Sequence, residues 1–155
     1  MAIDRADWHS GGDYPADLPP ENGGTHIGMF LAWAILNGLQ GEFHNEESPD
    51  ELAAVRARQM TGLEFLFQAC DGKFWRDDLS AEGNEFAAAY YSGEGGQGYG
   101  AYIEDYEGAL AHGLPTIYHV ADTWAIYDVI APVIDWRFAE WRAARVAPGT
   151  SPGGE

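Results

Sequence analysis

The chain has 155 residues, and 25 Asp and Glu against 8 Lys and Arg give it a formal net charge of −17 at pH 7. This length is typical of one domain, and a hydrophobic content of 46% is too high for a disordered acidic chain. The charge argues against nucleic acid and anionic membranes as partners, and it favours a basic protein or cations.

The first residues, Met1 to Asp7, lack the basic and apolar regions of a signal peptide, and the longest apolar stretch, 27–36, is too short for a membrane span. We therefore expect a soluble, cytoplasmic protein. Cys70 is the single cysteine, which excludes an intramolecular disulfide. Its apolar surroundings predict a small buried hydrophobe rather than a reactive thiol.

Residues 1–24 are rich in Gly, Pro, Asp and Asn and show no periodicity, so we expect an ordered but irregular arm. Thr25 can cap a helix over 26–39. That segment is apolar on every side, which is typical of a central, buried helix. Gly38 and Gly41 mark its end.

The next start signal is Ser48-Pro-Asp-Glu51, a capping box with proline at the first helical position, which predicts a helix to about Gln59. Thr61-Gly-Leu-Glu64 is a second capping box. It indicates either a new helix or a bend in one long helix, and Gly72 closes the segment.

Four further helices are predicted over 80–91, 101–111, 120–131 and 133–146, with Pro132 kinking or restarting the last pair. Alternating β patterns are absent. We therefore predict an all-α, compact single-domain bundle of six or seven obliquely packed helices over 1–146, followed by a disordered tail at 147–155.

Two pairs of motifs span nearly the whole chain. They are Trp8-His-x-Gly-Gly-Asp-Tyr-Pro15 with Thr25-His-Ile-Gly-Met-Phe-Leu-Ala-Trp33, and Tyr118-His-Val-Ala-Asp-Thr-Trp124 with Ile130-Ala-Pro-Val-Ile-Asp135. Together they resemble a family of small bacterial proteins catalogued only as a domain of unknown function. The resemblance implies no chemistry and no catalytic residues. In size and acidity the chain is similar to immunity proteins that neutralise secreted toxins, which is an analogy of composition rather than of motif.

Acidic side chains concentrate at 42–51 and 104–107, the second group beside tyrosines. Aromatic residues among acids can bind Arg- and Lys-rich partners through ion pairs and cation–π contacts, although such acids can also form only a solvated face. The residues expected to contact a partner are Glu46, Glu47, Asp50, Glu51, Tyr99, Tyr102, Glu104, Asp105 and Glu107. We favour an acidic immunity protein that needs no cofactor and occludes the basic active-site surface of a bacterial toxin such as a nuclease.

The alternative is a metal-binding protein or metal-dependent enzyme, with a divalent metal held by His9, Asp13, His26, His119 and Asp122. His119 and Asp122 are three residues apart on a predicted helix and would share a face. These groups could equally form structural hydrogen bonds that fix the arm to the helices. Because no spacing matches a known catalytic motif, the sequence favours a protein that is not an enzyme.

Overall fold

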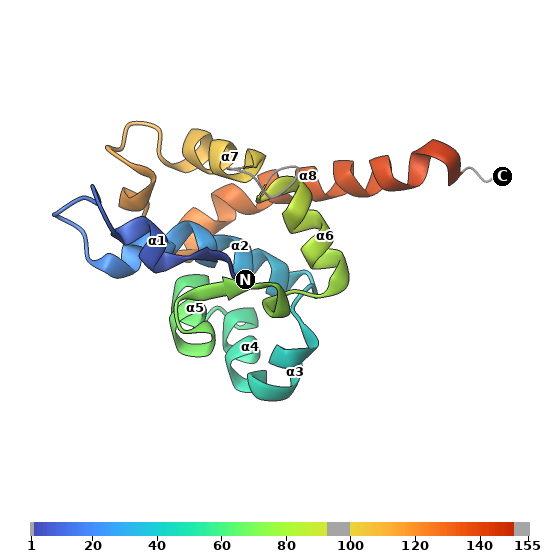
Figure 1. Ribbon diagram of the computed structural model, residues 1–155, viewed down its shortest axis with the longest axis horizontal. Helices are drawn as coiled ribbons and strands as arrows, with labels where there is room; N and C mark the ends of the chain where they lie inside the picture. The colour runs from blue at the N-terminus through green and yellow to red at the C-terminus, as the bar shows by residue number, and fades with distance from the viewer. Residues whose placement is uncertain (1, 93–99, 151–155) are drawn as a thin grey trace.

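A computed structural model describes residues 2–92 and 100–150, which form a mainly helical domain with one two-stranded sheet (Figure 1). The prediction of a compact all-α fold is confirmed. The α-helices of the described residues are α1 (Ala6–Ser10), α2 (Thr25–Leu36), α3 (Glu42–Glu47), α4 (Pro49–Arg56), α5 (Gly62–Cys70), α6 (Ala81–Tyr90), α7 (Ala101–Leu110) and α8 (Trp124–Thr150).

The first strand, β1 (Ala2–Arg5), pairs antiparallel with β2 (Lys73–Trp75), and the backbone N–H of Ala6 donates to the carbonyl of Gly72 at 2.9 Å. The prediction of an irregular arm without strands is therefore wrong for the start of the chain. It is also wrong at α1 and at a short 3₁₀ helix, Pro20–Gly24. Strands of four and three residues are too short to show an alternating pattern in the sequence.

Helix α2 is the centre of the domain. Its residues from Thr25 to Ile35 are all buried, and the Trp33 indole donates to Asp135 of α8 at 2.8 Å. A helix that is apolar on all sides needs neighbours on all sides. Helices α4, α5 and α8 pack against α2, and the Tyr102 ring of α7 contacts Phe30. Figure 1 shows α2 in the middle of the fold. The sequence prediction of a buried central helix is confirmed.

Helices α2 and α5 approach each other closely at two glycines, Gly28 and Gly62. A Cβ atom added to Gly28 would meet the backbone of Gly62 and Leu63, and one added to Gly62 would meet the Gly28 carbonyl. The two helix backbones touch here because neither residue has a side chain.

Local capping signals are confirmed in part. The Thr61 side chain accepts from the Glu64 backbone N–H at 3.1 Å, and the Glu64 carboxylate accepts from the Thr61 N–H at 2.8 Å, so α5 starts as a new helix. The predicted helix from 48 to 59 is shorter, since α4 ends at Arg56, and α3 precedes it. Ser48 makes no side-chain cap, and its hydroxyl lies 3.2 Å from His44 Nδ1 instead.

The end of the chain differs from prediction in two ways. Helix α8 runs through Pro132 without a restart, held by the fully buried Ile130 and Ile134 on either side. It also includes residues 147–150, which were expected in the disordered tail, while 151–155 lie outside the described residues. None of the helices in the described part of the chain is both long and apolar enough to cross a bilayer.

Candidate functional site

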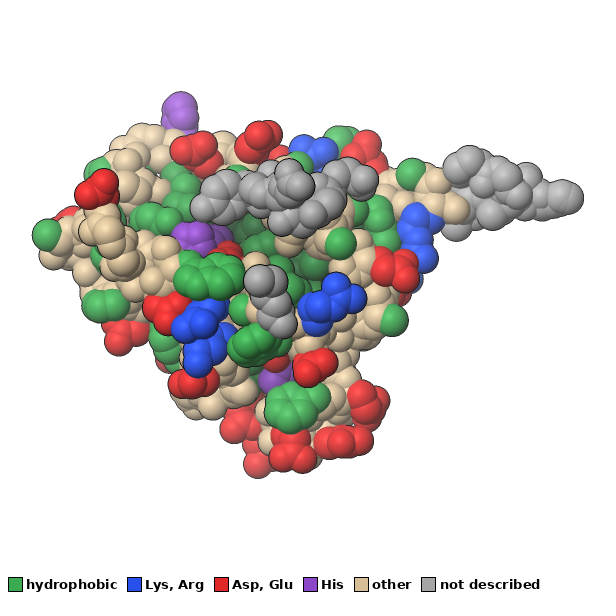
Figure 2. All heavy atoms as spheres, in the orientation of Figure 1, with side chains coloured by type: hydrophobic (Ala, Val, Ile, Leu, Met, Phe, Trp, Pro, Cys, Tyr) green, Lys and Arg blue, Asp and Glu red, His purple; other side chains and the backbone are tan. Residues whose placement is uncertain are grey.

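Acidic side chains gather over α3 and α4 at the lower end of the molecule (Figure 2). Glu46, Glu47 and Asp50 are exposed there, and Glu51 is partly exposed. Among residues 2–92 and 100–150, no cationic side chain pairs with any of them. The Phe43 ring lies on the same short helix and is 51% exposed. The predicted residues at 46–51 thus form an unpaired acidic surface beside an exposed aromatic ring, which we call the α3–α4 surface.

Most of the chain's Lys and Arg side chains are engaged outside this surface. Six of them form ion pairs with carboxylates outside it: Arg5 with Asp7, Arg58 with Asp128, Lys73 with Asp71, Arg137 with Asp105, Arg142 with Glu82 and Arg145 with Glu85. Those pairs cancel acidic charge locally. None of these pairs involves the acids at 46–51, whose charge is not cancelled in this way.

The second predicted contact group, near α7, is only partly available to a partner. Tyr102 is 1% exposed and donates to the His26 carbonyl at 2.6 Å, so its ring belongs to the core and is not available to a partner. Asp105 accepts from Arg137 and from the Tyr90 hydroxyl. Burial alone would raise the pKa of Asp105, but these hydrogen bonds outweigh it and hold the pKa below its ordinary value. Asp105 therefore serves the fold.

The remaining residues of that group are exposed or not described. Glu104 and Glu107 are exposed on α7, as expected of contact residues. Tyr99 lies outside the described residues.

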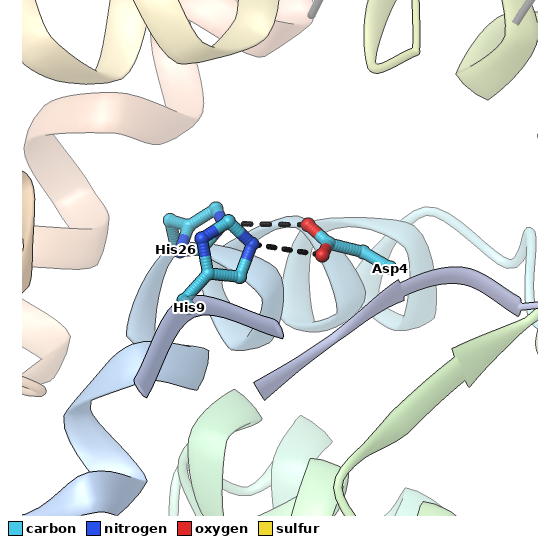
Figure 3. Close-up of side chains that lie close together, drawn as sticks. All are labelled: Asp4, His9 and His26. Atoms are coloured by element: carbon cyan, nitrogen blue, oxygen red, sulfur yellow. Dashed lines mark hydrogen bonds and ion pairs between the residues drawn. The ribbon is translucent and has the colours of Figure 1, made fainter. Parts of the chain in front are cut away.

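A buried cluster brings together two of the predicted metal ligands with a third residue that the sequence did not indicate. Asp4 of β1, His9 of α1 and His26 of α2 place three ligand atoms within 4.8 Å of one another (Figure 3). His9 Nε2 lies 2.8 Å from Asp4 Oδ1, and His26 Nε2 lies 3.4 Å from Asp4 Oδ2. Pairing of β1 with β2 carries Asp4 to this place, since Asp4 stands opposite Phe74 in the sheet.

Asp4 is the acceptor at the centre of the cluster. Besides its contacts with the two imidazoles, it accepts from the Tyr91 hydroxyl at 2.7 Å and from the Arg5 backbone N–H at 2.8 Å. Burial by itself would raise the pKa of Asp4, but its contacts with the His26 and His9 imidazoles hold that pKa well below its ordinary value. The carboxylate is therefore ionised in the folded protein at neutral pH.

His26 is the least satisfied member of the cluster. Its side chain is 2% exposed, and neither ring nitrogen has a hydrogen-bond partner among the described residues. Burial lowers its pKa, so the ring is neutral at pH 7 and offers a lone pair. His9, by contrast, is held at Nδ1 by the Tyr118 hydroxyl at 2.8 Å.

An open pocket of about 360 Å³ adjoins the cluster. His9, Glu107 and Tyr118 are among its lining residues. The pocket gives a small ligand or an ion a route to His9. It also places Glu107, which was predicted to bind a partner, near the histidine pair.

The other predicted ligands lie elsewhere. His119 is bound by Asp17 at 3.0 Å and by Thr116 at 2.9 Å. Asp122 accepts from Thr61 at 2.7 Å, and Asp13 is exposed and outside the cluster. The expectation that His119 and Asp122 share a helix face is wrong, because residues 117–119 form a 3₁₀ turn and α8 begins only at Trp124.

These features define a small acidic helical domain with a buried His–His–Asp cluster and an unpaired acidic surface. The chain belongs to the family described as "Domain of unknown function (DUF7832)", which matches residues 2–120. The sequence prediction of membership in an uncharacterised family is thereby confirmed. Neither the curated proteins nor the solved structures contain a significant match.

Proposed function

We propose that the protein binds a basic partner protein through the α3–α4 surface and acts as an immunity protein. The partner would be a bacterial toxin such as a nuclease, whose basic active-site surface the acidic side chains cover. The observation that carries this proposal is the group of unpaired carboxylates at 46–51 beside the exposed Phe43 ring. Opposite charge steers association, and an aromatic side chain supplies an anchor.

Helix electrostatics distinguish Glu46 and Glu47 from the other two acids of this surface. Asp50 and Glu51 lie in the first turn of α4, where the helix dipole favours negative charge. Glu46 and Glu47 lie in the last turn of α3, where the same dipole disfavours it. Glu46 and Glu47 are exposed and make no ion pair among the described residues, so they are free to pair with a cationic partner.

Charge reversal tests this proposal. Tagged wild-type protein would be used to capture partners from cells of the source organism, and the captured protein would then be purified. We expect Glu46→Lys with Glu47→Lys to lower its association rate constant by roughly tenfold or more, and to weaken inhibition of its activity, because steering is lost.

The matched control is Asp13→Lys with Glu21→Lys, which reverses two exposed acids on the N-terminal segment. The control should bind within about twofold of wild type at physiological salt, where distant charges are screened. Equal rates for all three proteins, or a captured partner whose activity the wild type does not inhibit, would contradict the proposal.

A second candidate function is divalent metal binding at Asp4, His9 and His26. The observation that favours it is His26, a buried neutral imidazole whose nitrogens make no hydrogen bond with the described residues and whose Nε2 lies 3.4 Å from the Asp4 carboxylate, beside a second imidazole. Two imidazoles and one carboxylate are a common donor set for first-row divalent metals. The set differs from the predicted one in that Asp4 replaces Asp13, His119 and Asp122.

Elemental analysis of native, untagged protein would test this candidate, together with melting curves in Zn²⁺ and Mn²⁺. We expect bound metal, and a rise in Tm on metal addition that His26→Gln reduces and the exposed His112→Gln preserves. Metal-free native protein with an unchanged Tm in both metals would remove the candidate.

A further inference from the structure

A second cluster of three buried side chains lies between α3, α5 and the 3₁₀ turn Arg76–Asp78. His44 Nε2 lies 2.7 Å from Asp78 Oδ1 and 3.8 Å from Cys70 Sγ, and Cys70 Sγ lies 3.5 Å from Asp78 Oδ1. All three residues are at most 9% exposed. Three different donor types thus converge on one point in the interior.

The arrangement is unsuited to a Cys–His–Asp nucleophile. In such a triad, the imidazole uses one nitrogen for the nucleophile and the other for the carboxylate. Here His44 presents the same nitrogen, Nε2, to both Cys70 and Asp78, while its Nδ1 faces the Ser48 hydroxyl. Burial, reinforced by Asp78, also raises the pKa of the Cys70 thiol, which keeps the free thiol uncharged and unreactive.

The distances instead match the ligand triangle of a tetrahedral metal. With Zn–S of about 2.3 Å and Zn–N and Zn–O of about 2.0–2.2 Å, tetrahedral angles put S about 3.6 Å from N or O, and N about 3.4 Å from O. The two sulfur distances already agree with this within about 0.2 Å. Only the 2.7 Å separation of His44 Nε2 and Asp78 Oδ1 has to widen. This would happen when the ion replaces the hydrogen-bonding proton between these two atoms.

The outer contacts of the cluster hold the ligands in the required orientation. The Ser48 hydroxyl fixes His44 Nδ1, and the Trp75 backbone N–H donates to Asp78 Oδ2 at 2.6 Å. Both contacts leave the metal-facing atoms free for an ion. Such second contacts to ligating imidazoles and carboxylates are usual in zinc sites.

An open pocket of about 280 Å³ reaches this cluster from the surface. Cys70 and Asp78 line it, together with Phe43, Trp75 and Asp77. The pocket provides an entry path for an ion and space for a fourth ligand. Three protein ligands with one open position is the arrangement of catalytic rather than structural zinc sites.

We propose that His44, Cys70 and Asp78 bind one Zn²⁺ ion, with the fourth coordination position open to this pocket for water or a small ligand. The site is separate from the Asp4–His9–His26 cluster, and its pocket opens beside Phe43 of the α3–α4 surface. Nothing in the spacing of the three residues indicated it, because they lie on three elements and 26 and 8 residues apart.

Titration of the metal-free full-length chain with Co²⁺, the spectroscopic substitute for Zn²⁺, tests the proposal. A thiolate-to-cobalt charge-transfer band can arise only from Cys70, since the chain has no other cysteine. We expect this band to saturate at one Co²⁺ per chain and to disappear on addition of Zn²⁺. Absence of the band in folded wild-type protein would overturn the proposal, whether or not any variant folds.

Variants locate the other ligands. Cys70→Ser should abolish the band, and His44→Gln should weaken Co²⁺ binding roughly tenfold or more. His9→Gln should leave the band intact, because His9 belongs to the other cluster. Circular dichroism confirms folding of each variant. A band of unchanged affinity in folded His44→Gln would contradict the assignment of His44.

Discussion

Gly28→Ala is expected to lower the free energy of unfolding by about 3 kcal/mol or more, because the added methyl group overlaps the α5 backbone at Gly62 and Leu63. No side-chain rotation can relieve a clash with backbone atoms, so α2 and α5 must move apart. That movement would open the core around the central helix, where most of the apolar burial lies. Urea denaturation followed by circular dichroism measures the change.

Gly108→Ala is the matched control. Gly108 is also a helical glycine, but it lies on the exposed side of α7, and an added Cβ has no neighbour within 4 Å. We expect this variant to gain about 0.5–1 kcal/mol, since alanine restricts the unfolded chain and favours the helix. Equal effects of the two substitutions would show that α2 and α5 are not in backbone contact.

Asp4→Ala is expected to cost about 3–5 kcal/mol, which is a large share of the stability of a domain of this size. The substitution leaves the Tyr91 hydroxyl, His9 Nε2 and the Arg5 N–H without their shared acceptor in a buried place. The neighbouring Asp7→Ala removes only an exposed ion pair with Arg5 and should change stability little. Urea denaturation in the presence of a chelator compares the two.

The same carboxylate sets a pH dependence in the metal-free protein. The pKa of Asp4 is lowered in the folded state, so its contribution is fully present above the unfolded value of about 4 and is lost as the pH falls below it. Asp4→Asn cannot titrate. Between pH 5 and pH 3, where carboxylates begin to protonate, this variant should therefore lose less stability than wild type. Parallel pH profiles for the two proteins would contradict the role given to Asp4.

Elements with a strong local signal could be predicted from the sequence. Helix α2 is apolar on every side, and its burial follows from that composition alone. The capping box at Thr61 predicted either a new helix or a bend at this point, and α5 begins as a new helix there. The acids at 46–51 could be identified from the sequence, because counting charged residues does not require a fold.

The site residues that were missed depend on pairing between distant segments. Asp4 reaches His9 and His26 only through the β1–β2 pairing, and strands of this length carry no visible pattern. His44, Cys70 and Asp78 have no common spacing, so no motif could join them. Tyr102 was assigned to the surface because its acidic neighbours are exposed, although its own face of α7 points into the core.

The pairing of β1 with β2 also constrains the order of folding. Asp4 accepts from the Tyr91 hydroxyl only when β2 is in place and Tyr91, just after α6, has arrived. During synthesis, the first strand therefore has to wait until more than half of the chain has been made. Because closing so long a loop is slow and comes after local helix formation, the histidine cluster is among the last parts of the molecule to assemble.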